Sequence, residues 1–416
     1  RRPDTRRAMR SEEGGGPWGN HGFPHANPRP DQEVAAALLD WLRDRTIAMC
    51  SLLERLARAE SPSRAPDAHR KAFVLLAGEL EAIGYLVKAV PGRGVGDHLY
   101  ARPAGRERNA PYQLLVGHLD TVWPVGTVET MPVWVDDGEL RGPGVVDMKG
   151  GLVQMVFALK ALAALRLKPP FAPVVHVASD EEVGSVDSKR HLIRLARGAA
   201  RAFVLEPAFG SAGKLKTARK GAGHFRIVVK GRAAHAGVAP EEGLSAILEL
   251  SHQIQRLFAL NDPSRGITVN VGTIDGGLRS NVVAPEAAAD VDVRVPTLAA
   301  AGEVEAAIRG LEPVGAGVKL EVEGGFGRPP MEATPRNLQL MHQAQSLGQL
   351  LGLPLEATSV GGASDGNYTS LYTATLDGLG SVGDGAHAAD ERVVVVRMPE
   401  RAALLALLLL APSEAP

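Results

Sequence analysis

The chain has 416 residues, of which 45% are hydrophobic and 22% charged, and its formal net charge at pH 7 is −1. This length exceeds one ordinary hydrophobic core, so we expect two domains. The near-neutral charge gives no reason to expect nucleic acid or an anionic membrane as a partner, and a single cysteine excludes an intramolecular disulfide and a zinc site built from cysteines.

The two ends of the chain differ from its middle. Residues 1–30 are rich in Arg, Gly and Pro and carry almost no aliphatic side chains, a composition typical of disorder. The first arginines resemble the charged region of a signal peptide, but no apolar stretch follows them, which does not favour export. Residues 402–411 are apolar over only about half of a membrane-spanning length. They predict a terminal helix packed on the core of a cytoplasmic protein.

Strands alternate with helices over much of the chain. Residues 31–60 show the apolar spacing of a helix, and its predicted buried face consists of Leu38, Leu39, Leu42, Ile47, Leu52 and Leu56. Further on, the pattern predicts strands at 112–119, 173–179 and 202–207 and helices at 149–165 and 188–197. Strands that are apolar on both faces and separated by helices are typical of an α/β fold with a mostly parallel sheet covered by helices.

The pattern changes between residues 214 and 330. Half-exposed strands are predicted at 224–232, 266–277 and 287–296, with helices at 242–260 and 300–311. These five elements, completed by a fourth strand before residue 330, give the order strand–helix–strand–strand–helix–strand, the split βαβ arrangement of a small ferredoxin-like α+β domain. We therefore expect a main domain made of residues 31–213 plus 331–416, interrupted by an inserted domain at 214–330.

Five candidate metal ligands follow one another along the main domain. They are His118 in GHLDTV, Asp147 in GPGVVDMKGG, Glu182 in SDEEVG, Glu206 in VLEP and His387 in GAHAADE. Neutral imidazoles, a carboxylate that can bridge two ions and further carboxylates are what a catalytic two-metal centre needs. His118, Glu182 and Glu206 come at or just after the ends of predicted parallel strands, the edge where such sheets bind ligands.

Two more carboxylates lie beside these ligands. Asp120 is two residues from His118, so on an extended segment both side chains point to the same side. Asp120 is therefore expected to accept the second ring N–H of His118 and to orient the imidazole. Glu181 precedes Glu182 and is expected to act as the general base that takes a proton from the attacking water.

Each of these residues has an ordinary structural interpretation when taken alone. His118 could be a capped histidine at a strand end, Asp147 a helix N-cap, the Glu181–Glu182 pair a solvated helix start and His387 a surface side chain. Glu206, in contrast, ends an apolar strand, where an unpaired charge is costly. The five ligands in this order together predict a metallohydrolase.

The motifs GHLDTV, GPGVVDMKGG, DEEVGS, VLEP, GRAAHAGVAPEEG and GGASDGN resemble those of the M20 family of di-zinc metallopeptidases over about residues 35–411. The chain resembles members close to the glutamate carboxypeptidase (carboxypeptidase G2-like) branch, and more distantly acetylornithine deacetylases and succinyl-diaminopimelate desuccinylases. The resemblance implies a phosphorylase/hydrolase-like zinc exopeptidase domain, with an inserted dimerisation or lid domain through which a homodimer forms.

The resemblance also implies a cofactor, two Zn²⁺ ions per subunit. One ion would be held by His118 and Glu206 and the other by Glu182 and His387, with Asp147 as the bridge. Co²⁺ or Mn²⁺ can replace zinc, because mixed oxygen and nitrogen ligands select weakly among these metals. Met148 follows the bridging aspartate where many relatives have a second acidic residue, which should leave ligation intact.

Further positions match the family's substrate contacts. His235 in GRAAHAG matches a histidine that reaches the substrate carbonyl, often in the partner subunit's site, as part of an oxyanion hole. Asn281 and Arg294 match positions near the substrate. A guanidinium suits a terminal carboxylate, although a structural ion pair remains an alternative for Arg294. Arg328 is expected to contribute similarly, and Gly361 and Gly362 to offer backbone donors to the carboxylate.

The favoured function is hydrolysis of the amide bond in a small peptide or N-acyl amino acid with a free carboxylate, as in a carboxypeptidase. A deacylase of N-acyl amino acids remains open, because it needs the same chemistry, and the loop GGASDGN leaves a glutamyl preference open. A non-catalytic metal-binding scaffold is a remote alternative that would not need Glu181. A nucleotide-binding enzyme is disfavoured, since Lys214 in GSAGKLKT is followed by Leu215 rather than Ser or Thr.

Overall fold

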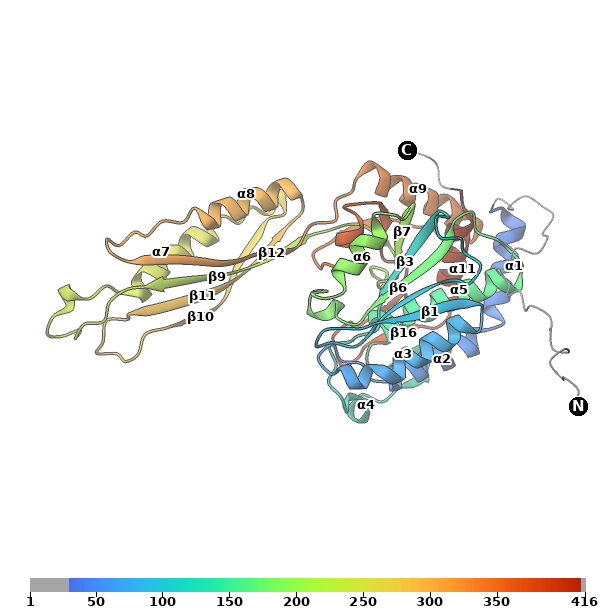
Figure 1. Cartoon of the computed structure of the whole chain (residues 1–416), viewed down its shortest axis with the longest axis horizontal. Coiled ribbons are helices and arrows are strands. Elements are labelled where there is room, and N and C mark those ends of the chain that lie inside the picture. The colour runs from blue at the N-terminus through green and yellow to red at the C-terminus, as the bar shows by residue number, and fades with distance from the viewer. Residues whose placement is uncertain (1–29, 413–416) are drawn as a thin grey trace, which may run out of the picture.

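The structure, a computed structural model, describes residues 30–412, and the disorder predicted for the N-terminal tail concerns residues 1–29, outside that range. Two lobes are visible in Figure 1. The larger lobe contains both ends of the described chain, and the smaller lobe projects from it as an arm made of four strands and two helices.

The larger lobe is built on a six-stranded sheet of order β1-β2-β6-β3-β7-β14. Its strands are β1 (Tyr85–Val90), β2 (His98–Pro103), β3 (Tyr112–His118), β6 (Ala172–Ala178), β7 (Arg201–Val204) and β14 (Ala374–Leu376). The four strands β6, β3, β7 and β14 run parallel. At one edge β2 pairs antiparallel with β6, and β1 pairs antiparallel with β2. The predicted mostly parallel sheet is confirmed.

Helices cover both faces of this sheet. Leu115 and Phe203 point into the larger core, and Leu114 and Val204, on the opposite face, pack against Leu192. The larger core holds α1 (Gln32–Arg43), α2 (Thr46–Arg58), α3 (Pro66–Glu81), α5 (Gly150–Ala164), α9 (Pro335–Leu350) and α11 (Arg397–Leu410). The other face is covered by α6 (Lys189–Ala196) and α10 (Gly366–Thr369).

The buried terminal helix is confirmed, because α11 packs on α5 and α1 and its residues 402–410 are buried. Residues 31–60, in contrast, form two helices, since the helix breaks at residues 44–45. Ile47 was expected on the buried face and is 86% exposed. The prediction was wrong for Ile47 because the break changes the direction of the chain, so the helical spacing cannot be carried across it.

The smaller lobe is the inserted domain, with its own hydrophobic core. Its elements are β9 (Gly221–Lys230), α7 (Ala246–Phe258), β10 (Thr268–Gly276), β11 (Glu286–Val295), α8 (Leu298–Arg309) and β12 (Lys319–Arg328). The antiparallel order β10-β11-β9-β12 is that of the split βαβ fold. Along β9 and β11 alternate residues are buried under the helices, which leaves the other face of the sheet more exposed. The predicted fold class is confirmed.

The two crossings between the lobes lie side by side. β8 (Leu215–Arg219) still pairs with β13 (Ala357–Val360) of the larger lobe, and Arg219 and Met331 exchange backbone hydrogen bonds of 2.9 and 3.0 Å. A Cβ on Gly221 would lie 2.7 Å from the nitrogen of Pro330, so this close approach requires glycine. We therefore place the inserted domain at 221–328, inside the expected range 214–330.

A second small sheet lies beside the main one, in the order β15-β16-β5-β4. Its strands are β4 (Trp134–Asp136), β5 (Glu139–Arg141), β15 (Gly383–Asp384) and β16 (Arg392–Val394), and a short helix, α4 (Thr127–Thr130), precedes it. The loop between β15 and β16 contains His387. Among the helices of residues 30–412, none is long and apolar enough to cross a membrane.

Candidate metal centre

The five predicted ligands converge at one edge of the main sheet. His118 ends β3, Glu182 lies in the turn after β6, and Glu206 follows β7 by two residues. Because β3, β6 and β7 are parallel, their carboxyl ends meet at this edge. Asp147 comes from the turn before α5 and His387 from the β15–β16 loop.

The carboxylate of Asp147 divides the ligands into two sets. Its Oδ1 atom lies 3.3 Å from Nε2 of His118, and its Oδ2 atom lies 3.4 Å from Nε2 of His387. On the first side Glu206 Oε1 is 3.5 Å from the same His118 nitrogen, and on the second Glu182 Oε2 is 3.2 Å from the same His387 nitrogen. Asp147 is therefore not a helix N-cap, and its two oxygens face different histidine–glutamate pairs.

These distances fit metal coordination better than direct hydrogen bonding. They lie at or beyond the long end of N–H···O hydrogen bonds, which is about 3.2 Å. Two atoms that each lie about 2.0–2.1 Å from one tetrahedral ion are about 3.4 Å apart. In addition, Nε2 of His118 and Oδ1 of Asp147 are buried and have no hydrogen-bond partner within the described residues. The residues present can thus hold metal ions.

The local charge also favours a bound cation. Burial alone would lower the pKa of His118, but Asp120, Asp147 and Glu206 raise it well above its usual value. The carboxylates of Asp147 and Glu182 raise the pKa of His387 to about 10. Both imidazoles are therefore protonated on both nitrogens, and positively charged, at neutral pH unless a metal ion replaces one of the protons.

Asp120 holds His118 in a way that differs in detail from the prediction. Nδ1 of His118 is 2.9 Å from the backbone oxygen of Asp120, whereas the Oδ1 atom of the side chain is 3.4 Å away. The Asp120 carboxylate accepts hydrogen bonds from Ser63 Oγ at 2.6 Å and from the backbone N–H groups of Glu181 and Glu182 at 3.1 Å. Asp120 thus positions both the imidazole and the turn that contains the two glutamates.

Glu181, the expected proton acceptor, is buried beside these ligands. One of its carboxylate oxygens lies within 4.8 Å of ligand atoms of both His118 and Glu206. Burial raises the pKa of Glu181 to about 8, although the positive charges of Arg328 and His118 act in the opposite direction. A carboxyl group with this pKa can take and return a proton near neutral pH.

Arg328, the last residue of β12, reaches from the inserted domain to this carboxylate. Its Nη1 donates to Glu181 Oε1 at 2.5 Å, and its Nη2 donates to the Glu181 backbone oxygen at 2.7 Å and to Ser185 Oγ at 3.0 Å. The guanidinium also lies over the ring of Tyr368. These bonds use three of the five N–H donors of the guanidinium, so a substrate carboxylate would be met by the Nε donor and the second Nη1 donor.

Arg294 is on the exposed face of the inserted domain's sheet. Its guanidinium makes a bidentate ion pair with Asp292, with both contacts at 2.9 Å, which is the structural alternative left open by the sequence. Arg294 of β11 and Arg328 of β12 both lie directly opposite Ala222 of the central strand β9, so the two arginines point to the same face of the sheet. Arg294 is therefore at the end of the sheet nearest the larger lobe.

His235 and Asn281 lie at the opposite end of the inserted domain. His235 is in the loop after β9, and Asn281 is in the loop after β10. The two loops are in contact, because the backbone N–H of Ala236 donates to the backbone oxygen of Asn281 at 3.0 Å. β9 has 10 residues, a length of about 33 Å, and runs outward from the junction (Figure 1). Both residues are therefore far from the ligands of their own subunit.

Gly361 and Gly362 follow β13, and a Cβ added to either would meet no atom within 4 Å. The oxygen of Gly362 accepts a hydrogen bond from Arg219, which sequence reasoning missed. Arg219 is buried, makes a bidentate ion pair with Asp377 and lies 3.5 Å from Glu206 Oε2. An arginine at the end of a short strand carries no sequence signal for this role.

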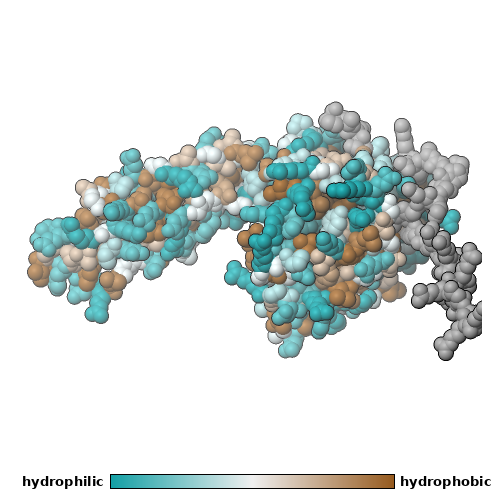
Figure 2. All heavy atoms as spheres, viewed as in Figure 1, coloured by the Kyte–Doolittle hydropathy of each residue, from teal (hydrophilic) through white to brown (hydrophobic). Residues whose placement is uncertain are grey.

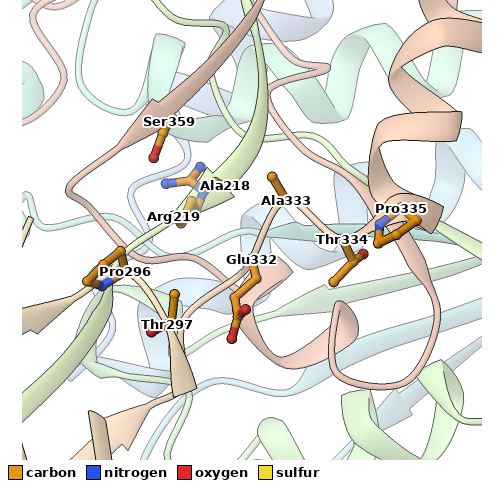
Figure 3. Close-up of a pocket in the computed structure, with 9 residues that line it drawn as sticks. All are labelled: Ala218, Arg219, Pro296, Thr297, Glu332, Ala333, Thr334, Pro335 and Ser359. Carbon is orange, nitrogen blue, oxygen red and sulfur yellow. The ribbon is translucent and has the colours of Figure 1, made fainter. Parts of the chain in front are cut away.

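A cavity of about 340 Å³ lies at the junction of the two lobes (Figure 3). Its lining comes from both, and consists of Ala218, Arg219, Pro296, Thr297, Glu332, Ala333, Thr334, Pro335 and Ser359. None of the five candidate ligands lines it. Arg219 is the one lining residue that also contacts a candidate ligand, Glu206.

Comparison with known proteins was made for the sequence and for the fold. Residues 217–311 match the model of the M20 peptidase dimerisation domain. The chain is 28% identical to carboxypeptidase G2 of a Pseudomonas species over 380 residues, which covers 88% of the chain and 90% of that relative. It is 27% identical to succinyl-diaminopimelate desuccinylase of Delftia acidovorans over 342 residues, with coverage of 77% and 87%.

Solved structures share the fold. Aminopeptidase PepT of Bacillus cereus matches with a TM-score of 0.73 at 20% identity, covering 88% of this chain and 98% of that one. The M20 family metallo-carboxypeptidase Sso-CP2 of Sulfolobus solfataricus matches with a TM-score of 0.65 at 14% identity and the same coverage. The comparisons of sequence and fold together confirm the resemblance that the motifs indicate.

Proposed function

We propose that the chain, a metal-dependent hydrolase similar to the M20 peptidases, cleaves the amide bond of a small peptide or N-acyl amino acid with a free terminal carboxylate. The observation that carries this proposal is the division of the Asp147 oxygens between two histidine–glutamate pairs, with Glu181 beside them. This arrangement supplies metal ligands and a separate proton acceptor, the groups that metal-assisted amide hydrolysis uses.

We assign two zinc ions to this centre. His118 and Glu206 would hold one ion, Glu182 and His387 the other, and Asp147 would lie between them. The mixture of imidazole nitrogens and carboxylate oxygens suits zinc, and Co²⁺ and Mn²⁺ suit the same ligands.

The side chains around the proposed metal ions have different roles in hydrolysis. When bound, the metal ions polarise the scissile carbonyl and lower the pKa of a nearby water. Glu181 accepts the proton of the attacking water and returns it to the leaving nitrogen, while Asp120 keeps the His118 ring in place through Nδ1. Arg328, together with the open loop at Gly361 and Gly362, is the proposed clamp for the substrate carboxylate.

We further propose that the protein works as a homodimer formed through the inserted domain. β10 is an edge strand of the sheet and is largely exposed, so it can pair with another strand. Large exposed hydrophobic side chains in this domain include Val238, Ile247, Leu248, Phe258, Ile274, Leu278 and Leu298, and hydrophobic residues are visible at its outer end in Figure 2. In a dimer, His235 and Asn281 could enter the partner subunit's site.

Deacylation of N-acyl amino acids is the second candidate, supported by the desuccinylase relatives. A panel of dipeptides, folate-type substrates and acylated glutamate, aspartate and neutral amino acids, tested with metal-loaded protein, would separate the two. Each substrate should be paired with its carboxyl-methyl ester as a control. Equal turnover of acids and esters would exclude the carboxylate clamp, and turnover of no member would exclude the proposed function.

Replacement of His387 by alanine is expected to lower the metal content by about half, because one proposed ion loses a ligand whereas the other keeps His118, Glu206 and Asp147. Elemental analysis of the dialysed protein measures this. His235→Ala is the matched control, since the same side chain is removed at the far end of the inserted domain, and it should keep the wild-type content. Unchanged stoichiometry in His387→Ala would place that ligand elsewhere.

Metal binding is expected to release protons at pH 7. The pKa of His387 is raised to about 10 without metal, and the pKa of His118 is raised well above its usual value. Both imidazoles are therefore positively charged at pH 7, and each must lose one proton before its Nε2 binds an ion. The release from His387 should therefore decline as pH rises through about 10. Calorimetric titrations in buffers of different ionisation enthalpy count the protons, and a heat independent of the buffer would contradict the expectation.

A further inference from the structure

Glu391 is a fully buried carboxylate that takes no part in the proposed chemistry. It accepts four hydrogen bonds. Its Oε1 atom accepts from the backbone N–H groups of Val146 at 2.9 Å and Asp147 at 3.0 Å. Its Oε2 atom accepts from the N–H of Gly144 at 2.8 Å and from the indole Nε1 of Trp123 at 2.9 Å. These bonds compensate for burying the charge.

The four donors lie on segments that bear the centre's functional residues. Val146 and Asp147 belong to the turn that presents the bridging carboxylate, and Trp123 follows Asp120 by three residues. Glu391 itself is four residues after His387. One carboxylate thus ties together three chain segments that are far apart in the sequence.

The backbone of Glu391 adds to this connection. The backbone oxygen of Glu391 accepts from the N–H of Gly142 at 3.2 Å. Its backbone N–H donates at 3.1 Å to the backbone oxygen of Ala388, the residue after His387. The β15–β16 loop and the segment 142–147 are therefore held against each other through a single residue. The distance of 3.4 Å between Asp147 Oδ2 and His387 Nε2 depends on how these two segments are placed.

We propose that Glu391 is a positioning residue for the metal centre: it binds no ion, and it fixes the Asp147 turn relative to the His387 loop so that both can share one ion. The inference rests on the proposed metal-dependent function. Groups that support metal ligands from outside typically change metal affinity by about 10–100-fold when replaced. A carboxylate that merely stabilised the fold would leave metal affinity unchanged.

The test compares Glu391→Gln with Glu249→Gln. Each carboxylate oxygen of Glu391 accepts two hydrogen bonds. Glutamine replaces one of these oxygens with an NH₂ group, which cannot accept, so two of the four donors lose their acceptor. Glu249 is a buried carboxylate of the inserted domain that accepts from the N–H groups of Val314 and Gly315 and from Gln253. Both substitutions damage a buried carboxylate that holds a loop, but Glu249 lies in the separate core of the inserted domain.

Three measurements are made on the full-length protein: thermal unfolding without metal, Co²⁺ affinity from the visible absorption of the bound ion, and kcat and KM at several metal concentrations. Both variants are expected to unfold at lower temperature. Only Glu391→Gln should bind one ion at least about 10-fold more weakly, with a lowered kcat that recovers in excess metal and an unchanged KM.

Wild-type Co²⁺ affinity in Glu391→Gln, together with reduced thermal stability like that of Glu249→Gln, would overturn the proposal. Should Glu391→Gln fail to fold, Trp123→Phe decides instead, because it removes one donor and keeps the carboxylate. Weaker Co²⁺ binding in that variant supports the proposal, and wild-type affinity overturns it. Failure of the proposed function would be distinguishable, because the wild-type protein itself would then bind no metal or remain inactive with it.

Discussion

Glu181→Gln is expected to lose about 10²–10⁴-fold in kcat while keeping its metal ions. The amide that replaces the carboxylate cannot accept the proton of the attacking water, whereas all five proposed ligands remain. KM should change little, since Glu181 is not proposed to hold the substrate in the ground state. Steady-state kinetics and elemental analysis of the same sample measure both effects.

The ion pair between Glu181 and Arg328 makes a control for folding necessary. Both side chains are buried, and a buried charge that loses its partner can cost about 3–5 kcal/mol of stability. In Glu181→Gln the amide oxygen can still accept from Arg328, and the backbone oxygen of Glu181 and Ser185 Oγ remain as its acceptors. Thermal unfolding of the variant, beside Glu249→Gln, separates a lost proton acceptor from a damaged fold. Turnover near the wild-type level in folded, metal-loaded Glu181→Gln would remove its proposed role.

The sequence predicted the parts of the centre that follow from strand order. His118, Glu182 and Glu206 come at or just after the ends of parallel strands, and parallel strands bring such ends together whatever the loops between them do. The apolar strands of the larger lobe and the amphipathic helices of the inserted domain could be predicted for a similar reason, because the periodicity of their hydrophobic residues is a local property of the sequence. The sheet and the convergence of these ligands therefore required no knowledge of long-range contacts.

Residues whose roles depend on long-range contacts were not predictable in this way. Glu391 lies 244 residues from Asp147 in the chain, and Arg219 lies 158 residues from Asp377. In the sequence Glu391 is one acidic residue in a polar loop, and Ser63 one serine near a proline. Their burial, which makes their hydrogen bonds strong, appears only when the segments pack.

Arg294 and Asp120 show the limit of transferring roles from a resemblance. Asp292 lies on the same face of β11 as Arg294 and accepts from Nε and Nη2, one edge of its guanidinium, so a neighbour two residues away changes what the matched residue contacts. For Asp120 the residue was identified, but its backbone oxygen rather than its carboxylate makes the close contact with His118. Matching a position indicates where a residue lies, and the local hydrogen bonds determine which atom acts.

Mixed dimers of two inactive variants are expected to regain activity. Glu181→Gln lacks the proton acceptor, and His235→Ala lacks the proposed oxyanion donor. Because His235 lies about 33 Å of strand away from the junction, we expect it to serve the site of the partner subunit. In a mixed dimer the subunit carrying His235→Ala keeps its own Glu181 and receives an intact His235 from its partner, so one of its two sites is complete.

Co-expression of the two variants with different affinity tags, followed by sequential purification, isolates these mixed dimers. They should show about half of the wild-type activity per dimer, whereas each parent dimer shows almost none. If His235 acted within its own subunit, neither site of the mixed dimer would be complete, because one would lack Glu181 and the other His235. Mixed dimers verified by mass spectrometry that stay as inactive as their parents would therefore exclude the proposed exchange of His235 between subunits, and a monomeric protein in solution would exclude the homodimer itself.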